Sequence, residues 1–362
     1  MKRILFLTAY PPTNVTAGQN YTRMLLEDIS SSNIVDVIYW DFQGHSEMVS
    51  HKVNTIESIK LNSFTKMLRS VVYFYLFPLF TVRFSLKKLL DIRRISDNYD
   101  VIYFDFSQVF MYSLFIKHPC KIMMCHDIIS QKYSRRRCSS IYNWFVIFSE
   151  KLLLSTAKYC FTFSNKDSMF LQKKLGINSS PVSFYIADEI KNIDVLDLEL
   201  SDNFIMYGAW NRPENYDGLL WFLREVMPHI SIKITIIGGG MPENIRTILG
   251  TLNVKYLGFV ENPYIHISES RGLIAPLFQG AGVKVKVIES LALGTPVVGT
   301  EVAFEGIPNL ISRNAMIRCE SSEEFIRSLN SFSTSVIEKH EIQKEFNERY
   351  SNAKFKNFLN TL

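Results

Sequence analysis

Residues 276–300 read PLFQGAGVKVKVIESLALGTPVVGT and are the most informative stretch of the chain. An apolar run ends at its start, and the glycines at 280 and 282 then predict a turn in which backbone N–H groups can approach a ligand closely. The pattern predicts a helix over 283–293, closed by Gly294, and a strand over 295–299. This order of elements is typical of a parallel sheet covered by helices.

The start of this helix carries two lysines, Lys284 and Lys286. The positive end of the helix dipole disfavours cations there unless something negative is bound, and free N–H groups at a helix start favour an anion. Glu289 follows on a neighbouring face, where a carboxylate can accept hydrogen bonds from a vicinal diol such as ribose. The stretch predicts a site for a nucleoside diphosphate, and an ordinary turn with a solvated Lys/Glu face is the alternative.

The same alternation of strands and helices extends over the whole chain and predicts two doubly wound α/β domains. Strands are predicted at 4–7, 35–39, 101–104, 121–125, 159–163, 182–185, 204–207, 233–237, 254–257, 272–275 and 295–299. Helices are predicted at 20–30, 63–95, 141–156, 166–174, 218–227, 242–249 and 283–293, with a helical C-terminal stretch at 321–362.

An acidic, irregular segment at 188–203 separates the two halves and is interpreted as a linker. We expect an N-terminal Rossmann-like domain at 1–190 and a C-terminal one at 200–340, with a final helix at 341–362 packing back on the first domain. Ligands of open α/β sheets bind beyond the carboxyl ends of the strands, so a cleft between the two domains is the expected site.

The composition excludes several classes of protein. With 362 residues, 47% hydrophobic and 21% charged, the chain is globular and long enough for two domains. A net charge of +5 is too small to favour nucleic acid as a partner. The five cysteines form no Cys-x-x-Cys pair, and no Asp-x-Asp occurs, so neither a zinc site nor a metal-chelated diphosphate is predicted. No apolar run reaches the length of a membrane span or a secretory signal.

The 276–300 stretch resembles the donor-binding motif of glycosyltransferase family 4, the glycosyl transferases group 1 with the GT-B fold. The matching positions are Gly280, Gly282, Lys284, Lys286, Glu289, Gly294, Pro296, Val297 and Val298. Other landmarks follow in family order: a glycine-containing first loop at 11–18, a His-Asp step at 126–127, a loop at 207–218 and the strand ends at 236–240 and 257–260.

The resemblance implies a retaining, hexosyltransferase-type enzyme that uses a nucleotide sugar and needs no metal or other cofactor. His126, Lys286 and Glu289 would be catalytic. The donor would be bound by Gly18, Arg212, Gly280, Gly282, Val283, Lys284, Lys286, Glu289 and Glu305. The acceptor would be a lipid-linked saccharide or polysaccharide, and the reaction would belong to cell-surface glycan biosynthesis.

The sequence departs from the family pattern at position 281. Many members carry two glutamates seven residues apart in this motif, and here the first is replaced by Ala281. This departure motivates an alternative hypothesis, a catalytically degenerate GT-B protein that is a non-catalytic partner in a glycan assembly complex. An epimerase of the same fold is a third reading, for which no additional carboxylates can be assigned.

Two basic segments with many aromatic residues, 63–95 and 132–144, predict contact with a membrane surface. Lysines and arginines beside exposed aromatic rings favour anionic lipid headgroups. A buried helix with a solvated basic side is the alternative. With no membrane span predicted, we expect a cytoplasmic protein that is peripheral on the inner face of the cell membrane.

Overall fold

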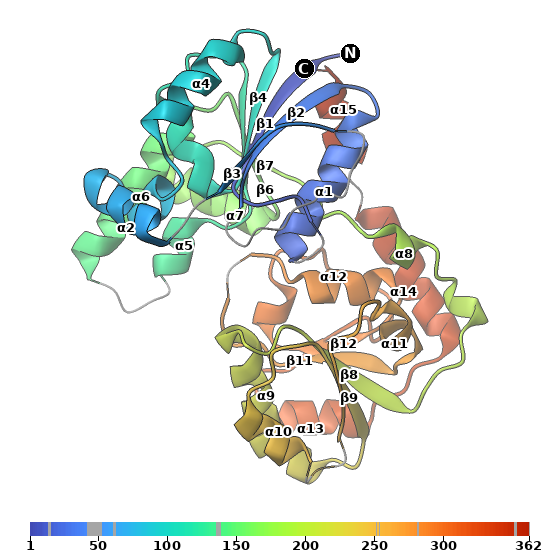
Figure 1. Ribbon diagram of the computed structural model, residues 1–362. Helices are drawn as coiled ribbons and strands as arrows, with labels where there is room; N and C mark the ends of the chain where they lie inside the picture. The colour runs from blue at the N-terminus through green and yellow to red at the C-terminus, as the bar shows by residue number, and fades with distance from the viewer. Residues whose placement is uncertain are drawn as a thin grey trace. The chain divides into compact units, whose positions relative to one another are not determined.

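Two parallel β-sheets organise the chain in a computed structural model (Figure 1). The structure describes residues 1–13, 16–41, 53–60, 63–134, 139–250, 252, 254–280, 282–350 and 353–361. Two compact units form, one from residues 1–185 together with 352–362, and the other from residues 186–351.

The first unit contains a seven-stranded sheet in the order β3-β2-β1-β4-β5-β6-β7, with all neighbours parallel. Its strands are β1 (Arg3–Thr8), β2 (Ile34–Asp41), β3 (Asn54–Lys60), β4 (Val101–Asp105), β5 (Lys121–Cys125), β6 (Tyr159–Thr162) and β7 (Ser180–Pro181). The chain leaves β1 in one direction toward β2 and crosses to β4 on its other side. Thr8 and Asp105 are paired in register there, so the ends of β1 and β4 meet where the strand order reverses.

Helices cover this sheet: α1 (Ala17–Ser30), α2 (Ser63–Val72), α3 (Pro78–Thr81), α4 (Leu86–Ser96), α5 (Ile129–Ser134), α6 (Ser140–Leu154), α7 (Asn165–Phe170) and α15 (Ala353–Thr361). A 3₁₀ segment, Ser107–Leu114, and a π turn, Leu171–Leu175, complete the unit. The predicted single helix at 63–95 is therefore wrong. Pro78 begins α3 and Ser85 is the N-cap of α4, because proline cannot continue a helix and serine favours a helix start.

Two strand predictions in this unit also need correction. The predicted strand at 182–185 is irregular, and the last sheet strand, β7, lies just before it at Ser180–Pro181. The strand β3 was not predicted, because its sequence NTIESIK has too few apolar residues for a buried-strand signal. It pairs with one neighbour only, at the sheet edge, where polar residues are tolerated.

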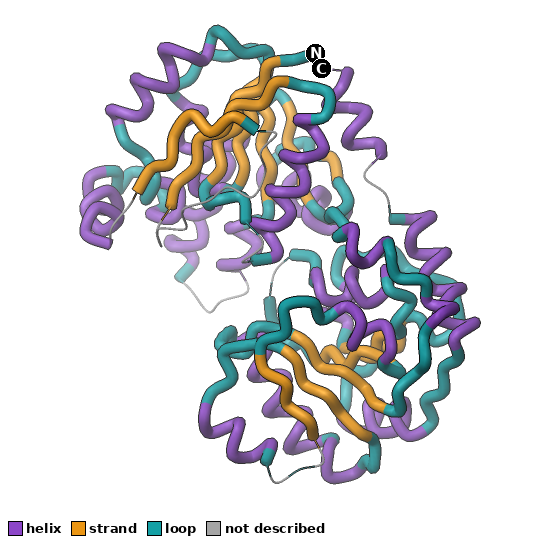
Figure 2. The backbone as a smooth tube through the Cα atoms, turned by 45° about the vertical axis from the view of Figure 1, so that its right-hand side comes forward, coloured by secondary structure: helices purple, strands orange, loops and turns teal. Residues whose placement is uncertain are grey.

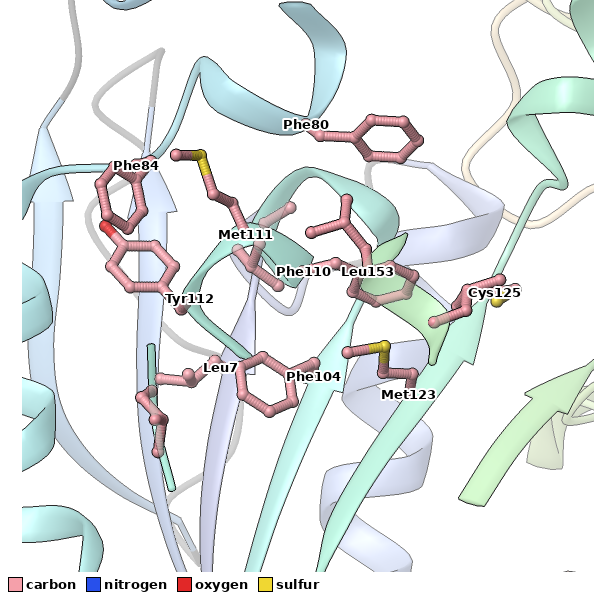
Figure 3. Packing of buried hydrophobic residues seen from close by; sticks show 14 of the residues in the cluster. Leu7, Phe80, Phe84, Phe104, Phe110, Met111, Tyr112, Met123, Cys125 and Leu153 are labelled. Carbon is pink, nitrogen blue, oxygen red and sulfur yellow. The ribbon is translucent and has the colours of Figure 1, made fainter. Parts of the chain in front are cut away.

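One large part of the core of the first unit lies between the sheet and the helices on one face (Figure 3), and Phe6 and Tyr103 belong to the buried residues outside this cluster. Leu7, Phe104 and Met123 point from β1, β4 and β5 into a cluster with Phe110 and other side chains. Their burial removes apolar surface from water, which is worth about 2 kcal/mol for each large side chain. Four cysteines, Cys120, Cys125, Cys160 and Cys319, are free and buried, the last of them in the second unit.

The second unit contains a six-stranded parallel sheet in the order β10-β9-β8-β11-β12-β13. Its strands are β8 (Asn203–Tyr207), β9 (Lys233–Ile237), β10 (Val254–Gly258), β11 (Gly272–Ala275), β12 (Val297–Gly299) and β13 (Met316–Arg318). The helices are α8 (Asp188–Lys191), α9 (Pro213–Glu225), α10 (Glu243–Leu249), α11 (Tyr264–Glu269), α12 (Val285–Ala292), α13 (Ser322–Asn330) and α14 (Val336–Arg349). Figure 2 distinguishes the strands of each sheet from the surrounding helices.

The C-terminal stretch forms two helices where the sequence suggested one at 341–362. The first, α14, belongs to the second unit, and α15 belongs to the first. The ring of Phe355 packs on the ring of Phe161 in β6, with the two centroids 4.8 Å apart. Lys356 forms an ion pair with Asp28 of α1. The predicted linker at 188–203 also contains structure, the short helix α8 and a 3₁₀ turn at Val195–Asp197.

A buried lysine on α14 holds α11 and the start of β11 in place. The Lys339 ammonium donates to the carbonyls of Ser268 and of Ser270, the latter at 2.8 Å. Burial lowers the pKa of Lys339 to about 7. Gly294, with φ +70°, sits against the same residue, and a Cβ at this position would lie 2.2 Å from the Lys339 carbonyl oxygen. The glycine that closes α12 therefore also permits close packing of α14.

Replacing Lys339 by Met should destabilise the protein by about 2 kcal/mol, because two buried carbonyls lose their donor. Since the folded-state pKa of Lys339 is lowered, the folded state binds fewer protons between about pH 7 and the ordinary lysine range, so this group makes stability rise with pH there. Urea unfolding of wild type and Lys339→Met at several pH values measures both effects. Lys344→Met, at an exposed position on the same helix, is the control. Equal free energies of unfolding for Lys339→Met and Lys344→Met would contradict the stabilising role of the Lys339 hydrogen bonds.

Candidate functional site

The loop between β11 and α12 is shaped by two glycines. Gly280 has φ +117° and Gly282 has φ +72°, and such values are unfavourable for other residues. The helix begins at Val285 after Lys284, which is its N-cap and provides no side-chain cap. The first N–H groups of α12 thus lack a side-chain acceptor from the N-cap residue, and the loop keeps a backbone conformation that only glycine adopts easily. Ala281 lies outside the described residues.

Lys286 turns its ammonium group inward. Its Nζ donates to Asn215 Oδ1 at 2.8 Å, and it lies 5.9 Å from the ring centroid of the buried Trp210. Burial, followed by the charges of Lys284 and Arg212, lowers the pKa of Lys286 to about 7, although Glu214 and Glu289 act in the opposite direction. The side chain is therefore a cation held at a net electrostatic cost, which a bound anion would relieve.

Lys284 and Arg212 supply the other positive charges of this cluster. The Lys284 ammonium donates to the carbonyl of Gly282 at 2.7 Å, so the side chain folds back over the loop. A Cβ built on Gly280 would lie 3.5 Å from Lys284 Cε, which places the lysine stem against the first glycine. Arg212 is exposed and is the N-cap of α9. The structure thus brings Arg212, Lys284 and Lys286 to one side of the second unit.

Glu289 is half-buried on the same helix. Its Oε1 accepts a hydrogen bond from the Tyr264 hydroxyl at 3.2 Å. Burial raises the pKa of Glu289 to about 7, against the lowering by the Tyr264 hydrogen bond and by Lys286. Burial and the nearby Glu289 also raise the pKa of Tyr207, at the end of β8, and of Tyr264. Lys286 and Glu289 therefore both have shifted pKa values, which are typical of functional sites.

The residues that hold this site are Asn215, Trp210 and Tyr264, and sequence reasoning did not single them out. Asn215 lies in the first turn of α9, where its Nδ2 also donates to the Ala209 carbonyl at 2.9 Å. The 207–218 stretch carried a resemblance as a whole, but nothing in it indicated which side chain would meet Lys286. Two further predicted residues, Val283 and Glu305, are half-buried, the first in the glycine loop and the second after the 3₁₀ segment Glu301–Phe304.

His126 belongs to a polar network in the first unit. Its Nε2 lies 2.8 Å from Oδ1 of Asp105, whose side chain is fully buried. The other carboxylate oxygen of Asp105 lies 2.6 Å from the Thr22 hydroxyl and 3.1 Å from the Thr8 hydroxyl. Because a carboxylate only accepts, these three groups donate, and the neutral imidazole carries its proton on Nε2. Asp105 therefore fixes both the tautomer and the orientation of His126.

Phe106 supports the same ring through a strained backbone. It has φ +65° and ψ 142°, a conformation that costs about 1–3 kcal/mol for a residue other than glycine. The strain places its ring flat on His126, with centroids 3.6 Å apart and planes 14° apart. Gly18, near the start of α1, faces both rings, because a Cβ there would lie 3.1 Å from Phe106 and 3.3 Å from His126 Nδ1. The structure thus brings Gly18 and His126 together.

Several solved structures share this architecture. The chain aligns over 100% of its length with sucrose-phosphate synthase from Thermosynechococcus elongatus, covering 98% of that chain with a TM-score of 0.71 at 14% identity. It also aligns with Anabaena HepE in complex with UDP over 100% of both chains, with a TM-score of 0.72 at 13% identity. The fold is GT-B. At these identities the likeness concerns the fold alone.

Sequence comparisons add information about part of the chain. Residues 201–334, which include most of the second GT-B unit, match the family model described as glycosyl transferases group 1. A protein described as an uncharacterized 44.6 kDa protein in the cps region of Klebsiella pneumoniae is 27% identical over 117 residues. That match covers 29% of this chain and 30% of the relative, so the chain matches about a third of the relative's length.

Replacing Asp105 by Asn should release His126 from its fixed tautomer, because an amide NH₂ can face Nε2 where the carboxylate oxygen stood. The imidazole ¹⁵N shifts of His126 should then move away from the Nε2–H pattern of the wild type. Asp100→Asn is the control, since Asp100 is exposed, accepts from the Arg3 amide and precedes the other end of β4. Unchanged ¹⁵N shifts for His126 in Asp105→Asn would show that Asp105 does not set the tautomer.

Proposed function

We propose that this protein is a glycosyltransferase that moves a sugar from a nucleotide-diphosphate sugar to a lipid-linked saccharide or polysaccharide. The observation that carries the proposal is the inward-facing ammonium of Lys286 at the start of α12, with Lys284 and Arg212 nearby and Glu289 one turn further along. The family match over 201–334 supports it, and the similarly folded HepE has been solved with UDP and with UDP-glucose.

In this proposal the pyrophosphate binds at the loop formed by Gly280, Gly282 and Val283. The N–H groups at the start of α12 donate to it, and the ammonium groups of Lys284 and Lys286 neutralise the charge that grows as the diphosphate leaves. Both ammonium groups already have acceptors, the Gly282 carbonyl and the Asn215 amide oxygen. A doubly charged diphosphate is a stronger acceptor than either neutral oxygen.

Glu289 binds the ribose of the donor. Its carboxylate accepts from the two vicinal hydroxyls, and the Tyr264 hydroxyl holds it in orientation at 3.2 Å. Arg212 and Glu305 contact the donor from the loops after β8 and β12. Because Glu289 is partly desolvated, its hydrogen bonds to a ligand are stronger than those of a solvated carboxylate.

His126 contacts the transferred sugar, and Asp105 is its positioning residue. Gly18 leaves room beside the imidazole, since any side chain there would press on His126 and Phe106. The proposed chemistry is retaining, hexosyl-type and independent of metal, as in glycosyltransferase family 4. The bond from the anomeric carbon to the diphosphate breaks, the acceptor oxygen bonds on the same face, and the acceptor proton passes to the departing phosphate oxygen.

Lys286→Met should lower turnover at least 100-fold, because one group that stabilises the leaving diphosphate is lost. The fold should persist, since methionine fills a similar volume without a buried charge. Hydrolysis and transfer are measured with a panel of nucleotide sugars, chosen after a thermal-shift screen of nucleoside diphosphates. Lys255→Met, at an exposed position on β10, should retain full turnover. Nucleotide binding without any turnover in the wild type would instead favour the non-catalytic partner that the alanine at position 281 suggested.

The affinity for a nucleoside diphosphate should depend on pH through both perturbed groups. The pKa of Lys286 is about 7 in the free protein and rises when an anion binds, so binding takes up protons and weakens as pH rises above 7. The pKa of Glu289 is raised to about 7, so its accepting form, and with it ribose binding, increases through the same range.

Two variants separate these opposing effects in titration calorimetry between pH 7 and 9. In Glu289→Gln the affinity should be lower and should fall steadily with pH, because only the lysine titrates. In Lys286→Met this decrease should vanish. If the affinity of Glu289→Gln did not change with pH, Lys286 would not bind the diphosphate.

A further inference from the structure

One surface of the first unit exposes an unusual number of large apolar side chains. They lie on α2 and the turn after it, and on α6, which Figure 1 draws beside α2. We call this surface the aromatic face. Its exposed members are Met67, Leu68, Val71, Val72, Phe74, Tyr75, Ile141, Tyr142, Trp144, Phe148 and Leu152. Scattered exposed apolar residues need no explanation, but a contiguous group of this kind marks an interaction surface.

The two parts of the aromatic face are held together by the segment after α2. The Phe77 ring lies edge-on to Tyr142, with centroids 5.6 Å apart, and its backbone N–H donates to Ser149 Oγ at 2.9 Å. On α6 itself, Trp144 and Phe148 stack with centroids 5.4 Å apart. The buried Phe77 thus connects the segment after α2 to α6, so the exposed side chains of both parts form one surface of the folded unit.

The charge around the aromatic face is mostly positive, and the acidic residues that flank the first segment, Glu57 and Asp91, both pair with Lys88. Residues 58–90 contain Lys60, Lys66, Arg69, Arg83, Lys87 and Lys88 and no Asp or Glu. Arg83 is buried and Lys88 pairs with Glu57, whereas Lys60 and Lys87 are exposed. On α6 the acidic residue is Glu150, which is buried and accepts from the N–H groups of Ile129 and Ser130, and Lys151 next to it is exposed.

Neighbouring α5 adds one exposed lysine to this pattern. Lys132 lies 3.9 Å from Asp127, a distance at which an exposed pair retains little attraction. The basic residues 135–137, which the sequence also suggested for this surface, lie outside the described residues. Like charges on two copies would repel each other across the aromatic face, whereas an anionic surface would attract it.

We propose that the aromatic face docks on a bilayer containing anionic lipids, with the aromatic and aliphatic side chains in the headgroup region and the lysines against lipid phosphates. No helix in the described ranges is long and apolar enough to cross a bilayer. On the first segment, residues 67–75 expose the largest group of apolar side chains, and α4 exposes Leu86 and Leu90 while it buries Leu89 and Ile92 in the core. On the second segment the exposed apolar side chains extend along α6 to Leu152.

Vesicle flotation with the full chain tests this proposal, using phosphatidylcholine alone or mixed with phosphatidylglycerol at 7:3. The wild type should float with the mixed vesicles and far less with the neutral ones, and 0.5 M salt should weaken binding. Of the four tryptophans, Trp144 is 63% exposed, Trp40 and Trp210 are buried and Trp221 is half-buried in the second unit, so binding through Trp144 should shift the fluorescence to the blue.

A matched pair of double variants locates the contact. Phe74→Ser with Ile141→Ser changes side chains that are 75% and 81% exposed, and should reduce binding at least tenfold without unfolding the protein. Ile311→Ser with Ile337→Ser changes side chains of similar exposure, 83% and 68%, in the second unit and should leave binding unchanged.

Three results would overturn the proposal: no preference for anionic vesicles, equal binding by the two double variants, or a dimer that the aromatic-face variant alone dissociates. The last would assign the face to a second copy of the chain. Donor hydrolysis is measured separately without vesicles, so failure of membrane docking and failure of the glycosyltransferase proposal are distinguishable.

Discussion

The candidate site of the second unit is built around the partly desolvated ammonium of Lys286, which lies at the positive end of helix α12. Asn215 supplies one neutral acceptor at 2.8 Å, and burial together with Lys284 and Arg212 lowers the lysine pKa to about 7. A stable fold alone has no need for this arrangement, since methionine would fill the same space. The surrounding structure, from the two glycines of the loop to the first turn of α9, keeps the charge where an anion would offset it.

The first unit has a comparable constraint in a buried carboxylate. Asp105 is fully buried at the end of β4, and its partners come from β1, α1 and the residue after β5. Register brings Thr8 and Asp105 together, so the sheet topology assembles the network at the point where the strand order reverses. The strained Phe106 and the small Gly18 then fix the space around the imidazole, so that orientation and room at His126 follow from the same few residues.

The sequence was informative where local chemistry decides structure. The strand at 121–125 has the bounds that its apolar run predicted, and Gly294 ends α12 with a positive φ. The long helix predicted at 63–95 is wrong because Pro78 begins a new helix and Ser85 is the N-cap of the next one, so the segment forms three helices. The polar edge strand β3 gave no periodic signal, because an edge strand buries less surface than a central one.

By itself the sequence determined the α/β architecture, the glycine loop and the positions of the charged residues on α12, since these follow from periodicity, turn chemistry and helix spacing. Only the tertiary structure decided which way those charges point and what holds them. Asn215 lies 71 residues before Lys286, and Asp105 lies 21 residues before His126. Parallel strand pairing and the crossover helices bring such pairs into contact. No local sequence pattern predicts these contacts, because the free energy that stabilises them comes from burial shared by the whole unit.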